Sequence, residues 1–414
     1  MRTPDKQMDY VEDLATLATG RTSDLFQEDL GRCWSEIQQS TKDRRVLVLG
    51  GAGTIGASTV KILSTLDLAC LHVVDQNENA LVELVRDLRS SRDGMNVRDF
   101  SALPLDFGSR IMLRHLESER PYDLVLNFAA LKHVRSEKGI CSALQMLETN
   151  LLKPLRFWRW LQETGSDAEY FSVSTDKAAD PVNLMGASKR IMEHLMFCAD
   201  GWMPAKRVTS SRFANVAFSN GSLLESFLQR FEKQQPLACP RDTSRFFISI
   251  REAGQICILA ALCGPDCHIV IPRLDAQSDS HLLSEIASRF LRSKGKEPEI
   301  HWNEETARAS SGNRYPGNRY PLLLTPLDTE GEKTSETFAG RDEEVVEFGM
   351  SRLLAVRYKP PVSLEVLRQF MRDLETFIEN PGKTVDKECL VQAVSRVIPE
   401  FQHSKSSHIL DERM

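Results

Sequence analysis

Two adjacent residues of opposite charge follow a short apolar run and could carry out proton transfer. The segment STDK (174–177) ends the run YFSVS (170–174), and MGASKR (185–190) follows it. A carboxylate beside an amine, here Asp176 and Lys177, can supply the acid and the base of a reaction. The same pair can also be a surface charge pair that closes a buried strand, and on these two residues alone we favour that simpler interpretation.

The composition describes an ordinary globular protein. The 414 residues are 41% hydrophobic and 27% charged, and the net charge of −6 gives no reason to expect a nucleic-acid partner. There is no apolar run of about 18 residues, so we expect no membrane span. Nine scattered cysteines and an acidic N-terminus without an apolar core favour the cytoplasm. Cys263, Cys267 and His268 lack a second ligand pair, so we expect no metal site.

A glycine-rich turn lies between an apolar strand and an amphipathic helix in RRVLVLGGAGTIGASTVKIL (44–63). Gly50 permits the tight turn, Gly53 lets the backbone approach a pyrophosphate, and Gly56 lets helix and strand pack closely. The N-terminus of the helix offers N–H groups to phosphates. A second strand, ACLHVVD (69–75), supports the motif, because it follows the helix and ends in an acid.

The type of dinucleotide follows from this acid. Asp75 lies about twenty residues beyond the turn, where a carboxylate accepts hydrogen bonds from the adenosine ribose. No arginine follows in QNENA (76–80) to hold a 2′-phosphate, so we expect NAD rather than NADP.

Strands and helices alternate along the next hundred residues, which predicts an α/β fold of the Rossmann type with a doubly wound parallel sheet. We expect helices at 81–90, 108–118 and 139–163, and strands at 96–106, 122–134 and 170–174. The domains that we expect are an N-terminal helical extension (1–42), an NAD-binding domain with the catalytic motifs (43–260), and a C-terminal substrate-binding region (261–414).

Ligands of such sheets collect beyond the carboxyl ends of the strands. The loop after Gly53, residues 127–132 and residues 175–177 all follow strand ends. Asp176 and Lys177 therefore share an edge with the cofactor, and the surface-pair interpretation loses its advantage.

The flanking regions are helical or irregular. Leu25, Phe26, Leu30, Cys33, Trp34 and Ile37 fall on one helical face that must pack on the main domain or on another subunit. Thr22 or Ser23 can cap that helix. The pentapeptide GNRYP occurs twice (312–316 and 317–321) and is typical of a loop, and two closing helices are expected at 361–381 and 384–398.

Five segments resemble one family of enzymes: LGGAGTIG (49–56), NFAALKHV (127–134), STDKAADPVNLMGASKR (174–190), SRFANVAFSNGS (211–222) and SRFFISIREAGQ (244–255). They are similar to the CapD-like nucleotide-sugar 4,6-dehydratases of polysaccharide biosynthesis, within the extended short-chain dehydrogenase/reductases. A fainter match is TEGEKTSETF (329–338), which resembles the family segment R-P-G-E-K-x-x-E.

The resemblance implies an internal redox cycle on bound NAD. The sugar is oxidised at C4, loses water between C5 and C6, and is reduced at C6. By motif, Asp176 would protonate the leaving hydroxyl and Lys177 would remove the C5 proton. Thr175 would bond the 4-hydroxyl, and Lys189 would bond the nicotinamide ribose.

Met185 departs from most of the superfamily, which has a tyrosine four residues before the lysine. A thioether cannot take up a proton. The methionine is typical of a branch that retains the configuration at C5, or else of a degenerate binding protein. The retained Asp176, Lys177 and Lys189 favour the first. The acceptor of the 4-hydroxyl proton then stays open, and Asp176, through Thr175 or water, is our first hypothesis.

The resemblance also assigns ligand-binding residues. Arg245 is the expected diphosphate ligand, and Glu332 aligns with the family glutamate, whereas Thr329 replaces its arginine, so that Arg314 or Arg319 could supply the missing charge. His133 is expected to be structural. The expected cofactor-binding residues are Gly50, Gly53, Thr54, Ile55, Gly56, Asp75, Asn77, Asp106 (an adenine contact), Phe107, Ala129, Ala130, Lys132, Asn150, Lys189 and Val216. The expected substrate-binding residues are Lys132, Ser174, Thr175, Asn215, Ser222, Arg245 and Glu332.

These observations predict a C5-retaining, NAD-dependent 4,6-dehydratase of a UDP-sugar, with UDP-N-acetylglucosamine as the substrate that the family implies. A nucleotide-sugar 4-epimerase and a non-catalytic NAD(H) sensor are the alternatives. The family also implies a homo-oligomer.

Overall fold

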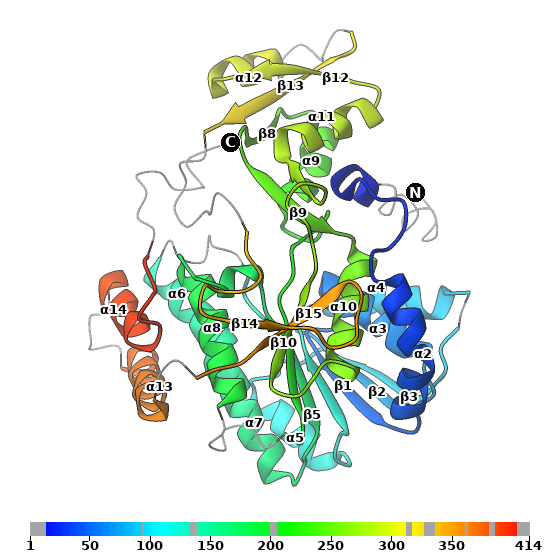
Figure 1. Cartoon of the computed structure of the whole chain (residues 1–414), viewed down its shortest axis with the longest axis vertical. Helices are drawn as coiled ribbons and strands as arrows, with labels where there is room; N and C mark the ends of the chain where they lie inside the picture. Colours follow the sequence, from blue (N-terminus) through cyan, green and yellow to red (C-terminus); the bar gives the residue numbers. More distant parts are fainter. Residues whose placement is uncertain are drawn as a thin grey trace.

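The computed structural model describes residues 14–92, 94–132, 137, 139–198, 205–311, 317–326, 336–360, 363–380 and 386–403. Its centre is a nine-stranded sheet in the order β14-β15-β10-β6-β5-β4-β1-β2-β3 (Figure 1). The strands from β3 to β10 are parallel, and β15 runs antiparallel to both of its neighbours. The strands are β1 (Arg45–Leu49), β2 (Leu68–Val74), β3 (Val97–Leu103), β4 (Leu124–Asn127), β5 (Glu169–Val173), β6 (Val208–Ser211), β10 (His268–Pro272), β14 (Glu344–Val346) and β15 (Leu353–Arg357). The predicted α/β Rossmann-like fold is confirmed.

Both faces of the sheet are covered by helices, which explains why central strands such as β1 and β4 are mostly apolar and buried. In β1, Val46 and Val48 face one core while Leu47 and Leu49 face the other. The first face carries α2 (Gln27–Thr41), α3 (Thr54–Ser64), α4 (Glu78–Ser90) and α10 (Ile250–Leu262). The second carries α5 (Arg110–Ser118), α6 (Ile140–Leu147), α7 (Lys153–Glu163), α8 (Leu184–Phe197), α13 (Leu364–Glu379) and α14 (Lys387–Val397).

A smaller region stands beyond one end of the large sheet, at the top of Figure 1. It contains the sheets β11-β9-β7 and β12-β13-β8. Its elements are β7 (Asn215–Val216), α9 (Leu223–Glu232), β8 (Leu237–Pro240), β9 (Ser244–Ile248), β11 (Ser280–Leu282), α11 (Leu283–Ser293), β12 (Glu297–His301), α12 (Glu304–Ser311) and β13 (Arg319–Thr325). Residues from both sides of position 260 build each region, so the expected domain boundary at that position cuts across the fold.

The N-terminal extension packs on the main domain. Its helix α2 begins at Gln27, after Phe26 at the N-cap, so the expected cap by Thr22 or Ser23 is wrong. The reason is tertiary: the Arg21 guanidinium and the Leu25 backbone N–H both bind the carboxylate of Glu252 on α10. These contacts hold the preceding turn in place, and the helix starts beyond it.

The expected helix over 139–163 is interrupted, and the two closing helices are present. A π-helical turn, Glu148–Leu152, separates α6 from α7. Helices α13 and α14 pack against the same core as α8. Among the described residues, no helix has the length and the apolar character that crossing a bilayer requires.

Candidate active site

The glycine-rich turn connects β1 to α3 and has the shape that a phosphate-binding loop needs. Gly50 has φ +69°, and a Cβ there would lie 2.5 Å from the backbone nitrogen of Ala129. A Cβ at Gly56 would lie 2.4 Å from the carbonyl oxygen of Gly50. Gly53 is the N-cap of α3, so the first N–H groups of the helix face the loop. The turn therefore fits a pyrophosphate, and with it a dinucleotide.

Replacing Gly50 with alanine is expected to lower both stability and NAD affinity. The positive φ costs an L-residue about 1–2 kcal/mol, and the added methyl group would collide with backbone. We expect NAD binding, followed by fluorescence titration, to weaken about tenfold or more. Gly53→Ala is the matched control for stability, because φ at Gly53 is −67° and the nearest atom to a new Cβ is 3.4 Å away. Equal melting temperatures for the Gly50→Ala variant and the wild type would contradict this expectation.

The acidic residues expected near the adenosine are held by the protein. Asp75 accepts hydrogen bonds from the backbone N–H groups of Ala52 (3.0 Å) and Asn77 (2.9 Å), which joins it to the glycine-rich turn. The side chain of Asn77 caps α4 by accepting a hydrogen bond from Ala80 N. The Asn77 side chain is therefore engaged in capping the helix that follows β2.

Asp106 and Phe107 follow β3. Burial opposes ionisation of Asp106, but its hydrogen bond from Lys153 (2.6 Å) and one from Gly108 N keep its pKa below the ordinary value. The ring of Phe107 is buried edge-on to that of Phe157, with centroids 6.3 Å apart. The Phe107 side chain thus belongs to the core, so that only the backbone of Phe107 is available to contact a ligand.

The loop after β4 is shaped by two asparagines. Asn127 Oδ1 accepts a hydrogen bond from Ala129 N. The buried Asn150 bonds both the N–H and the C=O of Leu131, and it also donates to Ser188 Oγ on α8. Asn150 therefore positions the loop that carries Ala129, Ala130 and the exposed Lys132. His133 lies outside the described residues.

The predicted acid–base pair lies at the carboxyl end of β5. Asp176 is buried and Lys177 is partly exposed, and Lys177 Nζ is 3.3 Å from Asp176 Oδ1. Thr175 Oγ1 donates to the same oxygen at 2.7 Å. Burial would favour the neutral amine of Lys177, but the charges of Asp176 and Glu336 outweigh it and raise its pKa. The pairing with Asp176 therefore favours the ammonium form of Lys177.

Met185 and Lys189 belong to the first turns of α8. Met185 is buried, and its backbone N–H donates to Glu137 Oε1 at 2.8 Å. Lys189 Nζ donates to the carbonyl oxygen of Val173 at 2.9 Å. Burial lowers the pKa of Lys189 to about 8, against an opposing effect of Glu193. Lys189 is therefore a buried cation near neutral pH at the end of β5.

Asn215 and Arg245, two of the predicted substrate ligands, meet at one carboxylate that the sequence did not single out. Glu336 Oε1 accepts a hydrogen bond from Asn215 Nδ2 (2.6 Å) and lies 3.3 Å from Arg245 Nε. Glu336 Oε2 accepts one from Phe246 N (3.2 Å). Burial and the charge of Asp176 raise the pKa of Glu336 to about 7, although Lys177 and Arg245 oppose this. Asn215 and Arg245 therefore contact Glu336 directly, and the charges of Asp176 and Lys177 lie near enough to affect its pKa.

A signal for Glu336 was present in the sequence. Within TEGEKTSETF, the family pattern R-P-G-E-K-x-x-E has two glutamates, and Glu336 aligns with the second. The first, Glu332, lies outside the described residues, as do Thr329 and Arg314. Arg319 is exposed at the start of β13.

The remaining predicted ligands have structural partners. Ser222 caps α9 by accepting a hydrogen bond from Glu225 N. Val216 is buried in β7. Thr54 Oγ1 accepts a hydrogen bond from Asn220 N, which joins the loop after β7 to the glycine-rich turn. Ser174 Oγ donates to Glu193 Oε1 at 2.6 Å.

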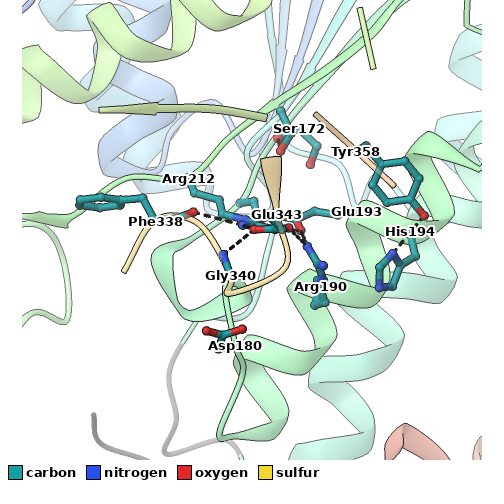
Figure 2. Close-up of polar contacts among 12 residues, drawn as sticks. Ser172, Asp180, Arg190, Glu193, His194, Arg212, Phe338, Gly340, Glu343 and Tyr358 are labelled. Carbon is teal, nitrogen blue, oxygen red and sulfur yellow. Dashed lines mark hydrogen bonds and ion pairs between the residues drawn. The ribbon is translucent and has the colours of Figure 1, made fainter. Parts of the chain in front are cut away.

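Behind this site lies a buried ion-pair network, defined here as Arg190, Glu193, Arg212 and Glu343 (Figure 2). The Arg212 guanidinium is fully buried and binds both oxygens of Glu193, at 2.7 and 2.5 Å, and both oxygens of Glu343, at 2.6 and 2.9 Å. Arg190 contacts both carboxylates as well. The network joins β6 and α8 to the chain segment that carries Glu336.

Comparison with known proteins agrees with the fold and the motifs. The family model described as "Polysaccharide biosynthesis protein" matches residues 46–353. A Methanocaldococcus jannaschii protein named uncharacterized membrane protein MJ1061 is 30% identical over 64% of this chain and 77% of its own length. The probable polysaccharide biosynthesis protein EpsC of Bacillus subtilis is 27% identical over 60% of this chain, which spans only 42% of EpsC. The UDP-N-acetylglucosamine 4,6-dehydratase (inverting) of Campylobacter jejuni is 24% identical over 59% of this chain and 71% of that enzyme.

A solved structure shows the same architecture. The X-ray structure of Pen from Bacillus thuringiensis superimposes with a TM-score of 0.60, at 20% identity, over 81% of this chain and 98% of Pen. Since the family model covers most of its length, the chain belongs to the polysaccharide biosynthesis protein family.

Proposed function

We propose that this protein is an NAD-dependent nucleotide-sugar 4,6-dehydratase that acts on UDP-N-acetylglucosamine and retains the configuration at C5. The observation that carries the proposal is the position of the Asp176–Lys177 pair at the carboxyl end of β5, on the same sheet edge as the glycine-rich turn after β1. A proton donor and acceptor beside a dinucleotide cradle suit a reaction that combines oxidation with elimination.

Gly50, Gly53 and Asp75 would hold the cofactor. Bound NAD would accept a hydride from C4 of the sugar and return it to C6. The elimination between these steps needs a neutral base near C5 and an acid near the 6-hydroxyl. Lys177 and Asp176 can provide both, because a proton that passes across their 3.3 Å contact leaves an amine and a carboxylic acid. We assign C5 deprotonation to Lys177 and protonation of the leaving hydroxyl to Asp176.

The other residues of the cluster would orient the substrate. The Thr175 hydroxyl donates to Asp176, and its oxygen can accept a hydrogen bond from a neighbouring hydroxyl of the sugar. Arg245 would bind the diphosphate, since a guanidinium matches phosphate oxygens. Lys189 would add positive potential at the end of β5 where the sugar is oxidised. Met185 supports retention at C5, because the branch of the family that has methionine at this position retains the configuration of that carbon.

Incubation with UDP-N-acetylglucosamine and NAD, followed by mass spectrometry of the nucleotide sugar, tests the proposal. We expect a product lighter by one water. An unchanged mass with a new epimer would instead support the epimerase, and no turnover would support the sensor. In deuterated solvent, NMR of the product should show deuterium at C5 with the configuration of the substrate, and inversion at C5 would overturn the retaining assignment.

A further inference from the structure

The oxidation at C4 needs a group that takes the proton of the 4-hydroxyl, and Met185 cannot do so. We propose that the carboxylate of Glu336 is this acceptor and thus a further catalytic residue. The inference rests on the proposed function and adds the proton acceptor that it lacks.

Several chain segments converge on Glu336. Asn215 on β7, Arg245 on β9 and the backbone of Phe246 all donate to its carboxylate or pair with it. The charges of Asp176 and Lys177 influence it directly. Two predicted sugar and diphosphate ligands therefore orient a carboxylate whose pKa responds to the charges of the acid–base pair.

The segment that carries Glu336 is held in place from several sides. Within residues 336–343, the carbonyl oxygen of Phe338 accepts a hydrogen bond from Arg212 (3.1 Å), and the Phe338 ring packs on Phe246 with centroids 5.5 Å apart. Glu343 anchors the far end of the segment in the buried ion-pair network, as Figure 2 shows. A general base needs this kind of fixed position.

Glu336 and Asp176 differ in the groups that surround their carboxylates. Lys177 Nζ contacts both oxygens of Asp176, at 3.3 and 3.5 Å, Thr175 Oγ1 donates to Oδ1, and Asp176 is needed as the acid of the elimination. Glu336 Oε2 receives Phe246 N as its donor among the described residues. A carboxylate oxygen has two lone pairs, so Oε2 can accept a further proton. Near neutral pH, the raised pKa of Glu336 makes that uptake easier than for an ordinary glutamate.

The O–H bond at C4 breaks and its proton joins Glu336. The electron pair of that O–H bond forms the C=O bond, and the hydrogen at C4 leaves with its bonding electrons as a hydride, which the nicotinamide of NAD would accept. The hydride returns to C6 while Lys177 gives the proton that it took from C5 back to that carbon, and Glu336 releases its proton to solvent.

The test compares Glu336→Gln with the wild type on the nucleotide sugar that the wild type converts. We expect kcat to fall about 100-fold or more while KM changes little. The carboxylate form is the active one, so wild-type kcat/KM should rise with pH through about 7, and Glu336→Gln should lose this limb. Glu347→Gln is the matched control, because Glu347 is exposed and pairs with Arg273 on the surface.

Two readouts separate catalysis from a merely structural role. Formate, a small carboxylate, should restore part of the activity of Glu336→Ala. If Glu336 only positioned other residues, added formate would not restore activity. In the NAD-loaded protein without sugar, infrared spectroscopy should show a protonated carboxyl below about pH 7 that is missing in Glu336→Gln.

A pH limb that persists in Glu336→Gln but disappears in Asp176→Asn would overturn the proposal in favour of Asp176. So would the absence of the infrared signal in the wild type. If the wild type converts no nucleotide sugar, the proposed function fails, and the infrared comparison still decides whether Glu336 holds a proton near neutral pH.

Discussion

Lys177→Ala should abolish the loss of water from the nucleotide sugar and still bind NAD. Lys177 is the expected base at C5, and a positioned general base contributes about 10²–10⁴-fold to a rate. Because oxidation at C4 precedes this step, a single turnover of the variant should leave NADH and the 4-keto sugar on the enzyme. Absorbance of NADH and mass spectrometry of the bound sugar measure both.

A matched control is Lys359→Ala, which removes an exposed lysine that pairs with Glu344 on the surface and should leave turnover intact. Normal turnover of Lys177→Ala would remove Lys177 from the mechanism. Loss of NAD binding in the variant would show that the lysine holds the cofactor site together instead.

Arg212→Met should destabilise the protein by about 3–5 kcal/mol, because removing one member of a buried ion pair leaves charges without compensation. Arg212 and Glu193 are both 0% exposed, and Glu343 is 11% exposed. Denaturant unfolding followed by circular dichroism measures the change. The control is Arg98→Met at the exposed ion pair with Asp43, for which we expect about 0–1 kcal/mol. A similar, small loss in both variants would contradict the structural role of the network.

The same network predicts how stability responds to acid. Burial opposes the charge of Glu343, but Arg212 and Arg190 outweigh it and lower its pKa to about 2. A depressed carboxyl pKa stabilises the folded state above the unfolded value, and this stabilisation is lost as the pH falls towards about 2. The difference in stability between wild type and Arg212→Met should therefore shrink with acidification over that range.

The local motifs were predictable because they are encoded in short windows. The apolar runs at β1, β2 and β5 and the glycines at 50, 53 and 56 are each set by residues close in sequence. Parallel strands linked by helices have few alternative arrangements, so the alternation of elements led to the correct fold class. The shared sheet edge of the glycine-rich turn and Asp176–Lys177 follows from that topology.

Contacts between distant residues were not predictable in the same way. Asn215 and Glu336 are 121 positions apart, and Arg212 and Glu343 are 131 positions apart. The start of α2 likewise depends on Glu252, more than two hundred residues away. In each case one partner is a glutamate, which from its sequence position alone would be expected on the surface. Its contacts matter for the structure because the folded chain buries it.

The sequence by itself determined the chemistry that is available: a dinucleotide turn, an acid beside a base, and a methionine where a proton acceptor is usual. The tertiary structure alone decided which groups act together. It favoured the ammonium form of Lys177, joined Asn215 and Arg245 to Glu336, and raised the pKa of that glutamate. The physical reason is that burial and neighbouring charges set a protonation state, and both exist only once the chain has folded.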